Sequence, residues 1–174
     1  MRCVVCALAK NENLYINEWC HHYFDIGFKK IYIFDNNDLD KPFIGDYIDK
    51  TIRNKVVIID KRGIRQWRLL HKVYQEFYDT YKNTFEWCLF CDCDEFLTGV
   101  SDINAFVSQD KFNDYDQIRI KWKVFGDDEM LERDTRQPVH GTFKKVVNDA
   151  TYSNSGKCMV RGRLSPLEFS SCQL

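Results

Sequence analysis

The sequence predicts an α/β fold, in which a mostly parallel central sheet is flanked by helices. Short β-rich runs alternate with segments of helical period along most of the chain, which is typical of βαβ units. Hydrophobic residues make up 44% of the 174 residues, enough for one globular domain with a sizeable core. Acidic residues follow several predicted strands at their carboxyl ends, where open α/β sheets bind ligands.

The amino-terminal third contains three predicted strands. Residues 2–9 form a short β-rich run, which the polar segment Lys-Asn-Glu-Asn interrupts. A helix follows, because apolar side chains recur at every third or fourth position and a glycine ends the run. These apolar side chains are Ile16, Trp19, Cys20, Tyr23 and Phe24. A second strand then runs to Asp35, residues 43–52 have the pattern of a helix, and residues 55–60 form a third strand.

The alternation of helix and strand continues further along the chain. Residues 64–81 keep a helical period over several turns, and residues 85–92 form a fourth strand that ends in acidic side chains. A short helix over residues 103–109 and a fifth strand over residues 116–125 complete the pattern. We expect the resulting sheet to be covered by helices on both faces.

The last third of the chain has a weaker pattern. Residues 126–141 are polar and aperiodic, which predicts a long loop. Residues 142–147 and 157–163 are two short strand-like pieces. The final residues, 164–174, receive no assignment.

Composition excludes several classes of function. The chain carries 25 basic and 26 acidic residues, so no net positive field attracts nucleic acid. No segment approaches the roughly 20 apolar residues that span a bilayer, and the opening segment lacks the features of a signal peptide. The eight cysteines come with no export signal, so we expect reduced thiols and a cytoplasmic protein rather than a disulfide framework. Peripheral association with a membrane stays open.

Carboxylates collect where the predicted parallel strands end. Asp92 and Asp94 follow the fourth strand, and the alternation of side chains places them on one face, opposite Cys91 and Cys93. Adjacent carboxylates repel each other unless a cation lies between them, and their oxygens suit Mg²⁺ or Mn²⁺. The alternative is an acidic N-cap for the short helix that follows.

Three cysteines near this strand have a spacing that suggests zinc. Alternation along the strand, however, places Cys88 on the opposite face from Cys91 and Cys93. No second Cys/His pair at ligand spacing completes a four-ligand site. We therefore expect buried strand thiols.

Three segments near the ends of predicted strands form a common pattern. The first follows the first strand and consists of Lys10, Asn11 and Glu12, then Glu18 and Trp19. The second is IYIFDNND, at residues 31–38, and the third is DCDEF, at residues 92–96. Together these segments resemble glycosyltransferases of the GT-A fold, in particular the family-2-like and family-92-like groups. The resemblance covers roughly residues 3–125 and implies a Rossmann-like nucleotide-diphospho-sugar transferase.

The resemblance implies a nucleotide site near the ends of the first two strands. The loop from Ala9 through Asn11 to Glu12 would contact the base and ribose, and Asp35 would hydrogen-bond the base. Two alternatives stay open for these residues. Glu12 could be a solvated loop charge or help to cap the first helix, and Asp35 could begin an Asx turn with Asn37.

The resemblance also implies a metal site. Asp92 would lie near the ribose and the metal, and Asp94 would be the main ligand of Mn²⁺ or Mg²⁺, bridging to the diphosphate. Such a metal stabilises the charge that develops on the departing nucleoside diphosphate. Gln66 opens the long predicted helix, where it would reach the nucleotide unless it lies on an exposed helix face.

The acceptor side is less well specified. Trp122 is either a platform for the acceptor sugar or an aromatic residue of the strand core. An inverting transferase needs a carboxylate base, and Asp127 and Asp128 lie in the predicted loop where such a base would sit. The family usually has a small polar pair there, whereas this sequence has three acids, because Glu129 follows.

These observations predict a metal-dependent, inverting glycosyltransferase that moves a sugar from a nucleotide-diphosphate donor, UDP-linked by preference, to a saccharide acceptor. Residues 1–100 would form the nucleotide-binding half of a single domain. Residues 101–174 would form a partial acceptor half, because family members commonly continue well beyond this length. The alternative is a shortened GT-A domain that binds nucleotide and metal without transferring sugar. An aspartate-nucleophile phosphatase is disfavoured, since its D-x-D follows the first strand.

Overall fold

The computed structural model describes residues 2–64, 66–126, 137–147 and 155–164, with residues 66–71 described by their backbone. The described residues form one six-stranded sheet in the order β3-β2-β1-β4-β6-β5. Its strands are β1 (Cys3–Ala9), β2 (Lys30–Asp35), β3 (Val56–Asp60), β4 (Trp87–Phe90), β5 (Gln117–Lys121) and β6 (Gly156–Arg161). Three α-helices accompany the sheet, α1 (Ile16–Asp25), α2 (Gln66–Tyr81) and α3 (Ile103–Val107).

The sheet has a parallel part and an antiparallel edge. Strand β1 pairs in parallel with β2 and β4, and β2 pairs in parallel with β3. Strand β6 runs antiparallel between β4 and β5. The predicted α/β class with a helix-flanked sheet is therefore confirmed, and the sheet itself is mixed.

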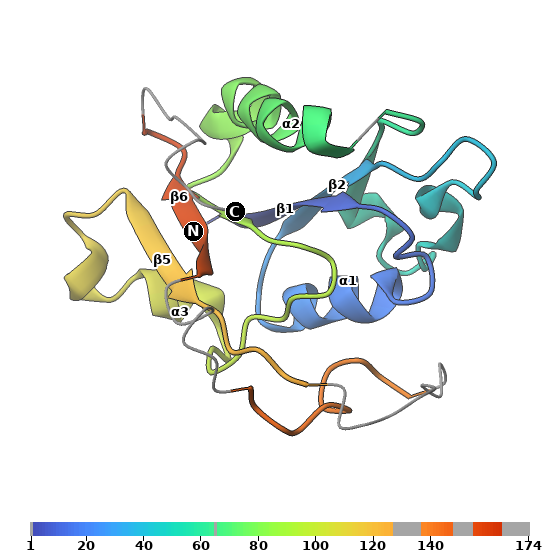
Figure 1. Ribbon diagram of the computed structural model, residues 1–174. Helices are drawn as coiled ribbons and strands as arrows, with labels where there is room; N and C mark the ends of the chain where they lie inside the picture. The colour runs from blue at the N-terminus through green and yellow to red at the C-terminus, as the bar shows by residue number, and fades with distance from the viewer. Residues whose placement is uncertain (1, 65, 127–136, 148–154, 165–174) are drawn as a thin grey trace.

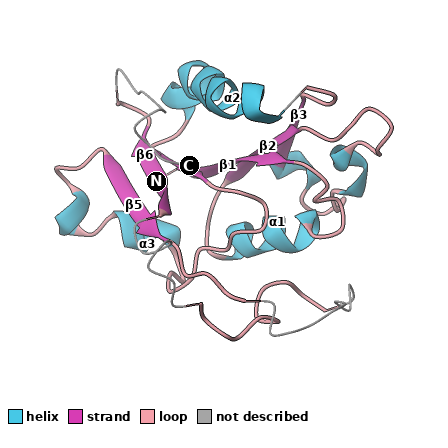
Figure 2. Ribbon diagram, in the orientation of Figure 1, coloured by secondary structure: helices cyan, strands magenta, loops and turns pink. Residues whose placement is uncertain are grey.

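Helices cover both faces of the sheet. Helix α2 lies on one face, whereas α1 and α3 lie on the other (Figures 1 and 2). Strand β1 is buried along its whole length, with Val5 packed on the α1 side and Val4 on the α2 side. A strand buried on both faces needs apolar side chains at every position, which explains why β1 shows no polar alternation.

The predicted helix over residues 43–52 is wrong. This segment contains a 3₁₀ turn, η1 (Ile44–Tyr47), and a second one, η2 (Arg53–Lys55), follows it. Ile44, Ile48 and Ile52 are all buried. Their four-residue spacing reflects burial against the α1 face of the sheet rather than a helix, and an extended backbone at Ile48 ends the first turn.

The predicted fifth strand is too long. Strand β5 ends at Lys121, and the pairing with the β6 side continues only as one hydrogen bond, from the backbone N–H of Trp122 to Ser155 O at 3.2 Å. Beyond that point Phe125 makes an isolated bridge with Val146, so residues 142–147 are not a sheet strand. The strand-like piece at residues 157–163 is confirmed as β6, which Arg161 ends.

The described cysteines are all buried, and no disulfide joins any two of them. Cys91 and Cys93 pack in the α1-side core, whereas Cys88 packs in the α2-side core. The three thiols therefore do not converge on one zinc ion. Separately, no described helix has both the length and the apolar character needed to cross a membrane.

Candidate functional site

The candidate site lies at the carboxyl end of β4, where the chain enters a tight turn. The backbone N–H of Glu95 donates to the Asp92 carbonyl at 3.2 Å. In the opposite direction, the Asp92 N–H donates to the Glu95 carboxylate at 2.9 Å. The turn over residues 92–95 is thus closed by two reciprocal hydrogen bonds, neither of which uses the carboxylate of Asp92 or Asp94.

This turn does not cap a helix. Helix α3 begins after Asp102, whose carboxylate accepts hydrogen bonds from the backbone N–H groups of Asn104 and Ala105. Asp102 therefore occupies the N-cap position that the sequence allowed for the earlier acids. The alternative in which Asp92 or Asp94 caps the short helix is wrong.

Helix α1 holds the turn from below. The indole N–H of Trp19 donates to the carbonyls of Asp92 and Glu95, at 3.0 Å each, and the Tyr23 hydroxyl donates to the Glu95 carbonyl at 3.1 Å. Trp19 and Tyr23 are both fully buried. Two of the segments that carry the family resemblance are thus in direct contact, and buried side chains of α1 hold the turn that carries the carboxylates.

Three carboxylates surround the end of β1 and the turn. Asp94 is exposed and makes no hydrogen bond or ion pair with the described part of the chain. Glu12 is half-buried in the loop after β1. Burial raises the pKa of Glu12, and the charges of Asp94 and Asp92 raise it further. This electrostatic coupling favours the binding of a cation near Glu12 and Asp94.

A lysine that sequence reasoning missed contacts the same carboxylates. Lys157 in β6 is 6% exposed, and its Nζ lies 2.7 Å from Asp92 Oδ2 and 3.7 Å from Glu95 Oε2. Its ammonium also lies 5.4 Å from the centre of the Trp122 ring. Burial opposes the charge on Lys157, but the hydrogen bond to Asp92 and the charges of both carboxylates raise its pKa on balance. The sequence does contain a signal for this residue, because Lys157 directly precedes the apolar residues of a predicted strand.

Burial also opposes the charge of Glu95, and here it determines the net direction of the pKa shift. It raises the pKa of this carboxyl to about 7, against the lowering effects of the Asp92 N–H and of Lys157. Glu95 therefore titrates near neutral pH, which sets it apart from an ordinary surface glutamate.

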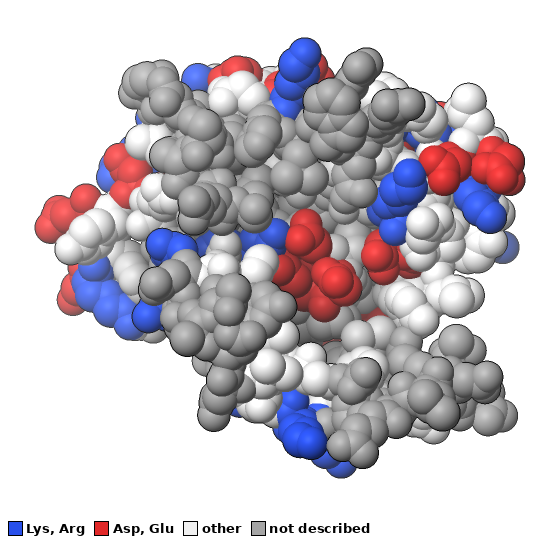
Figure 3. All heavy atoms as spheres, viewed as in Figure 1, with Lys and Arg blue, Asp and Glu red and all other residues white. Residues whose placement is uncertain are grey.

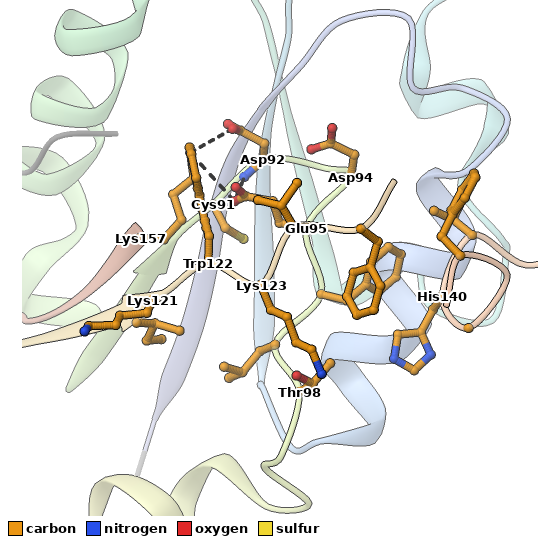
Figure 4. A pocket seen from close by; sticks show the side chains of 18 of the residues that line it. Cys91, Asp92, Asp94, Glu95, Thr98, Lys121, Trp122, Lys123, His140 and Lys157 are labelled. Carbon is orange, nitrogen blue, oxygen red and sulfur yellow. Dashed lines mark hydrogen bonds and ion pairs between the residues drawn. The ribbon is translucent and has the colours of Figure 1, made fainter. Parts of the chain in front are cut away.

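A cavity of about 930 Å³ opens above the turn. Acidic side chains gather near the centre of this face, with basic side chains on their left (Figure 3). In Figure 4 Asp92 lies between Lys157 and Asp94, and dashed lines mark the two contacts of the lysine. The polar and aromatic lining includes Asp92, Asp94, Glu95, Lys121, Trp122, Lys123, His140 and Lys157. The cavity is large enough for a ligand of nucleotide size.

The opposite wall of the cavity comes from the segment 137–147. Glu18 in α1 accepts hydrogen bonds from the backbone N–H groups of Val139 and His140. The His140 ring packs against His22 and Phe96, with centroid distances of 5.2 and 5.3 Å. Helix α1 therefore positions both the carboxylate turn and the facing wall.

The predicted nucleotide loop follows β1 as expected. Ala9 is buried and its carbonyl accepts the backbone N–H of Asn36 at 2.8 Å. Asn11 has a φ of 63°, in the left-handed region that non-glycine residues seldom adopt, and its N–H donates to Asn37 Oδ1 at 2.8 Å. The same Asn37 side chain donates to Asn13 and to the carbonyl of Pro42. The loop is thus held in one conformation by the end of β2.

Asp35 lies at the end of β2, with no exposed surface. One carboxylate oxygen accepts the N–H of Asn37 at 2.9 Å, and the other accepts the N–H of Ile44 at 2.8 Å. These contacts match the Asx turn that was the alternative for this residue. In this arrangement Asp35 shapes the loops around the site and has no surface that faces a base.

The remaining predicted site residues differ in whether the structure describes their side chains. Gln66 is the first residue of α2, and its side chain lies outside the described residues, as do Asp127 and Asp128. Trp122 follows the end of β5 and lines the cavity, so the alternative of a strand core aromatic is wrong. Its indole nitrogen is buried without a hydrogen-bond partner within the described parts of the chain.

The donor set fits a metal that is only partly coordinated by protein. Among the described residues, no group of three or more His, Cys, Asp or Glu side chains is arranged to hold a metal ion by itself. Mg²⁺ typically takes one or two carboxylates and completes its shell with water and substrate phosphates. Asp94 offers an unengaged carboxylate, and Asp92 has one oxygen that Lys157 does not contact.

Comparisons with models of known protein families and with curated proteins find no match to this chain.

Proposed function

We propose that this protein is a metal-dependent glycosyltransferase of the GT-A fold. It would move a sugar from a nucleotide-diphosphate donor, UDP-linked by preference, to a saccharide acceptor with inversion. The observation that carries the proposal is the Asp92–Glu95 turn at the carboxyl end of β4, where exposed Asp94 faces a cavity of about 930 Å³. Carboxylates at this edge of a parallel sheet are placed where α/β folds bind nucleotides.

The loop after β1 supports the donor side of this proposal. Its left-handed Asn11 and half-buried Glu12 lie at the end of a strand that pairs directly with β4. Asp94 would hold the Mn²⁺ or Mg²⁺ ion, with Asp92 beside it. When bound, the ion supplies Lewis-acid stabilisation of the leaving diphosphate. The chain itself supplies the oriented carboxylates, because Trp19 fixes the turn that carries them.

The acceptor side is proposed more coarsely. Trp122 lines the cavity and offers an aromatic surface of the kind on which sugar rings pack. The proposed base is Asp127 or Asp128. Residues 1–100 would bind the donor and residues 101–174 would contribute to the acceptor side, although β6 places Lys157 from the second half against the carboxylates of the first. The buried free cysteines support a cytoplasmic location.

The first experiment is thermal unfolding with Mn²⁺ and UDP, GDP or CDP. A nucleotide at a hundredfold over its Kd stabilises the fold by about 2.7 kcal/mol, which raises Tm by roughly 5–11 °C in a domain of this size. We expect UDP to cause this rise only when Mn²⁺ is present. Asp94→Ala should abolish the rise, because the diphosphate loses the cation that neutralises it.

Asp114→Ala is the matched control, since Asp114 is also an exposed aspartate but lies in the loop before β5, outside the cavity lining. It should keep the full rise. A protein that shows no rise with any nucleotide and metal would contradict the proposal. A rise without release of UDP from any UDP-sugar would instead indicate the shortened, binding-only domain.

A further inference from the structure

Of the described charged residues that line the cavity, Lys157 is the most deeply buried. Its backbone lies in β6, which pairs with β4 on one side and β5 on the other, and Lys157 is opposite Ile120 of β5. The neighbouring residues of β6 are buried. The side chain is therefore directed by the sheet toward the carboxylate turn. A buried ammonium needs a charged partner, and Lys157 has two, Asp92 and Glu95.

The ammonium group of Lys157 lies where one cation can interact with both Asp92 and Glu95. Its nitrogen lies 2.7 Å from one oxygen of Asp92 and 3.7 Å from one oxygen of Glu95, so one positive charge serves two carboxylates. A divalent ion between the same two groups would occupy the same space. The face of Trp122 closes the other side of the ammonium, at 5.4 Å.

Asp94 differs from these two acids. It is exposed, it makes no ion pair with the described residues, and Lys157 does not contact it. The turn therefore separates one carboxylate that is open to a metal from two that already share a cation.

We propose that Lys157 is a built-in cation that takes the place of a divalent ion at Asp92 and Glu95, so that metal binds at Asp94 chiefly together with the phosphates of a nucleotide. The part of this proposal that concerns the nucleotide rests on the proposed function. Lys157 is in this view a positioning residue that makes metal binding depend on the donor, because Asp94 alone is a weak metal site.

The test uses Mn²⁺ alone, followed by the loss of the electron paramagnetic resonance signal of the free ion. The unmodified protein should bind Mn²⁺ weakly without nucleotide. Lys157→Met and Lys157→Gln should each bind Mn²⁺ at least about tenfold more tightly, because two carboxylates become available to the ion. Lys157→Arg should remain like the unmodified protein, and adding Asp92→Asn to Lys157→Met should remove the gain.

Lys121→Met is the matched control, since Lys121 also lines the cavity but makes no described contact with the acidic turn. It should change Mn²⁺ affinity much less than Lys157→Met, which separates direct replacement from a general change in charge. Unchanged affinity in folded Lys157→Met and Lys157→Gln, or an equal gain in Lys121→Met, would overturn the proposal.

A second measurement does not depend on the folding of the Lys157 variants. In the otherwise unmodified protein, Asp94→Asn should weaken Mn²⁺ binding, whereas Asp92→Asn should leave it nearly unchanged, because Lys157 already engages Asp92. The reverse order would overturn the role of Lys157. None of these measurements involves nucleotide, so failure of UDP to bind would count against the proposed function and leave this inference to its own result.

Discussion

Glu18 in α1 accepts a hydrogen bond of 2.7 Å from the backbone N–H of His140, which lies 122 residues further along the chain. Its second carboxylate oxygen accepts the N–H of Val139 at 2.8 Å. A carboxylate that receives two backbone donors from one segment holds that segment strongly, because both hydrogen bonds are charge-assisted. The wall of the cavity that faces the acidic turn is thus attached to α1 through Glu18, in addition to its bridge from Val146 to Phe125 after β5.

We expect Glu18→Ala to loosen this wall. The two backbone donors would lose a charged acceptor, which typically costs about 1–3 kcal/mol per hydrogen bond to a charged group. Hydrogen–deuterium exchange should become faster at residues 139–141 while β1 and β2 keep their protection. Glu76→Ala is the control, since Glu76 is an exposed helix glutamate with only a 3.4 Å ion pair to Lys61. If hydrogen–deuterium exchange at His140 were unchanged in Glu18→Ala, the hydrogen bonds to Glu18 would not be what holds this wall.

We expect Trp19→Phe to destabilise the protein more than Trp87→Phe. Both indoles are fully buried, but Trp19 Nε1 donates to two carbonyls of the acidic turn, whereas Trp87 Nε1 has no hydrogen-bond partner among the described residues. The two substitutions remove similar packing, so their difference reports the lost hydrogen bonds, about 1–3 kcal/mol. Urea unfolding of both variants measures that difference.

A further result should separate the two tryptophan variants. Trp19→Phe should also reduce the rise in Tm caused by Mn²⁺ and UDP, because the turn that carries Asp94 loses its support. Trp87→Phe should preserve that rise. Equal unfolding free energies and equal ligand responses for the two variants would show that the Trp19 hydrogen bonds do not hold the turn.

The raised pKa of Glu95 predicts a loss of stability as the pH increases. Burial raises this pKa from 4.5 to about 7 in the folded protein, so the native state binds a proton that the unfolded chain releases between these values. Glu95 thus contributes its full stabilisation below about pH 4.5 and loses it as the pH rises through about 7. The expected loss is on the order of 1–3 kcal/mol between pH 5 and 7.5.

Glu95→Gln isolates this effect from the other titrating groups. The amide cannot ionise, but its oxygen can still accept the Asp92 N–H, so the turn keeps its reciprocal hydrogen bond. The free energy of urea unfolding should therefore depend less steeply on pH in the variant than in the unmodified protein. Parallel pH profiles for the two proteins would mean that Glu95 titrates normally.

Local sequence patterns predicted the elements of the parallel half. The buried strands are recognisable as continuous apolar runs, and α1 is recognisable by apolar side chains at helical spacing. Both patterns can be read from the sequence because they involve residues that are close together in the chain. The positions of Asp92 and Asp94 after β4 follow in the same way, as does the separation of Cys88 from Cys91. The four-residue spacing of Ile44 and Ile48 led to a wrong helix prediction, because side chains that are buried without a helix can show the same spacing.

The sequence by itself therefore determined strands β1 to β4, helices α1 and α2, and the carboxylates at the end of β4, but not the 3₁₀ turns between β2 and β3. Only the tertiary structure decided the partners of those carboxylates. Lys157 reaches Asp92 across 65 residues, and Trp19 reaches the carbonyl of Asp92 across 73. The physical reason is that these contacts depend on the antiparallel insertion of β6 beside β4 and on the packing of α1 beneath the sheet. Neither arrangement leaves a periodic signal in the chain, because the residues that meet share no local spacing.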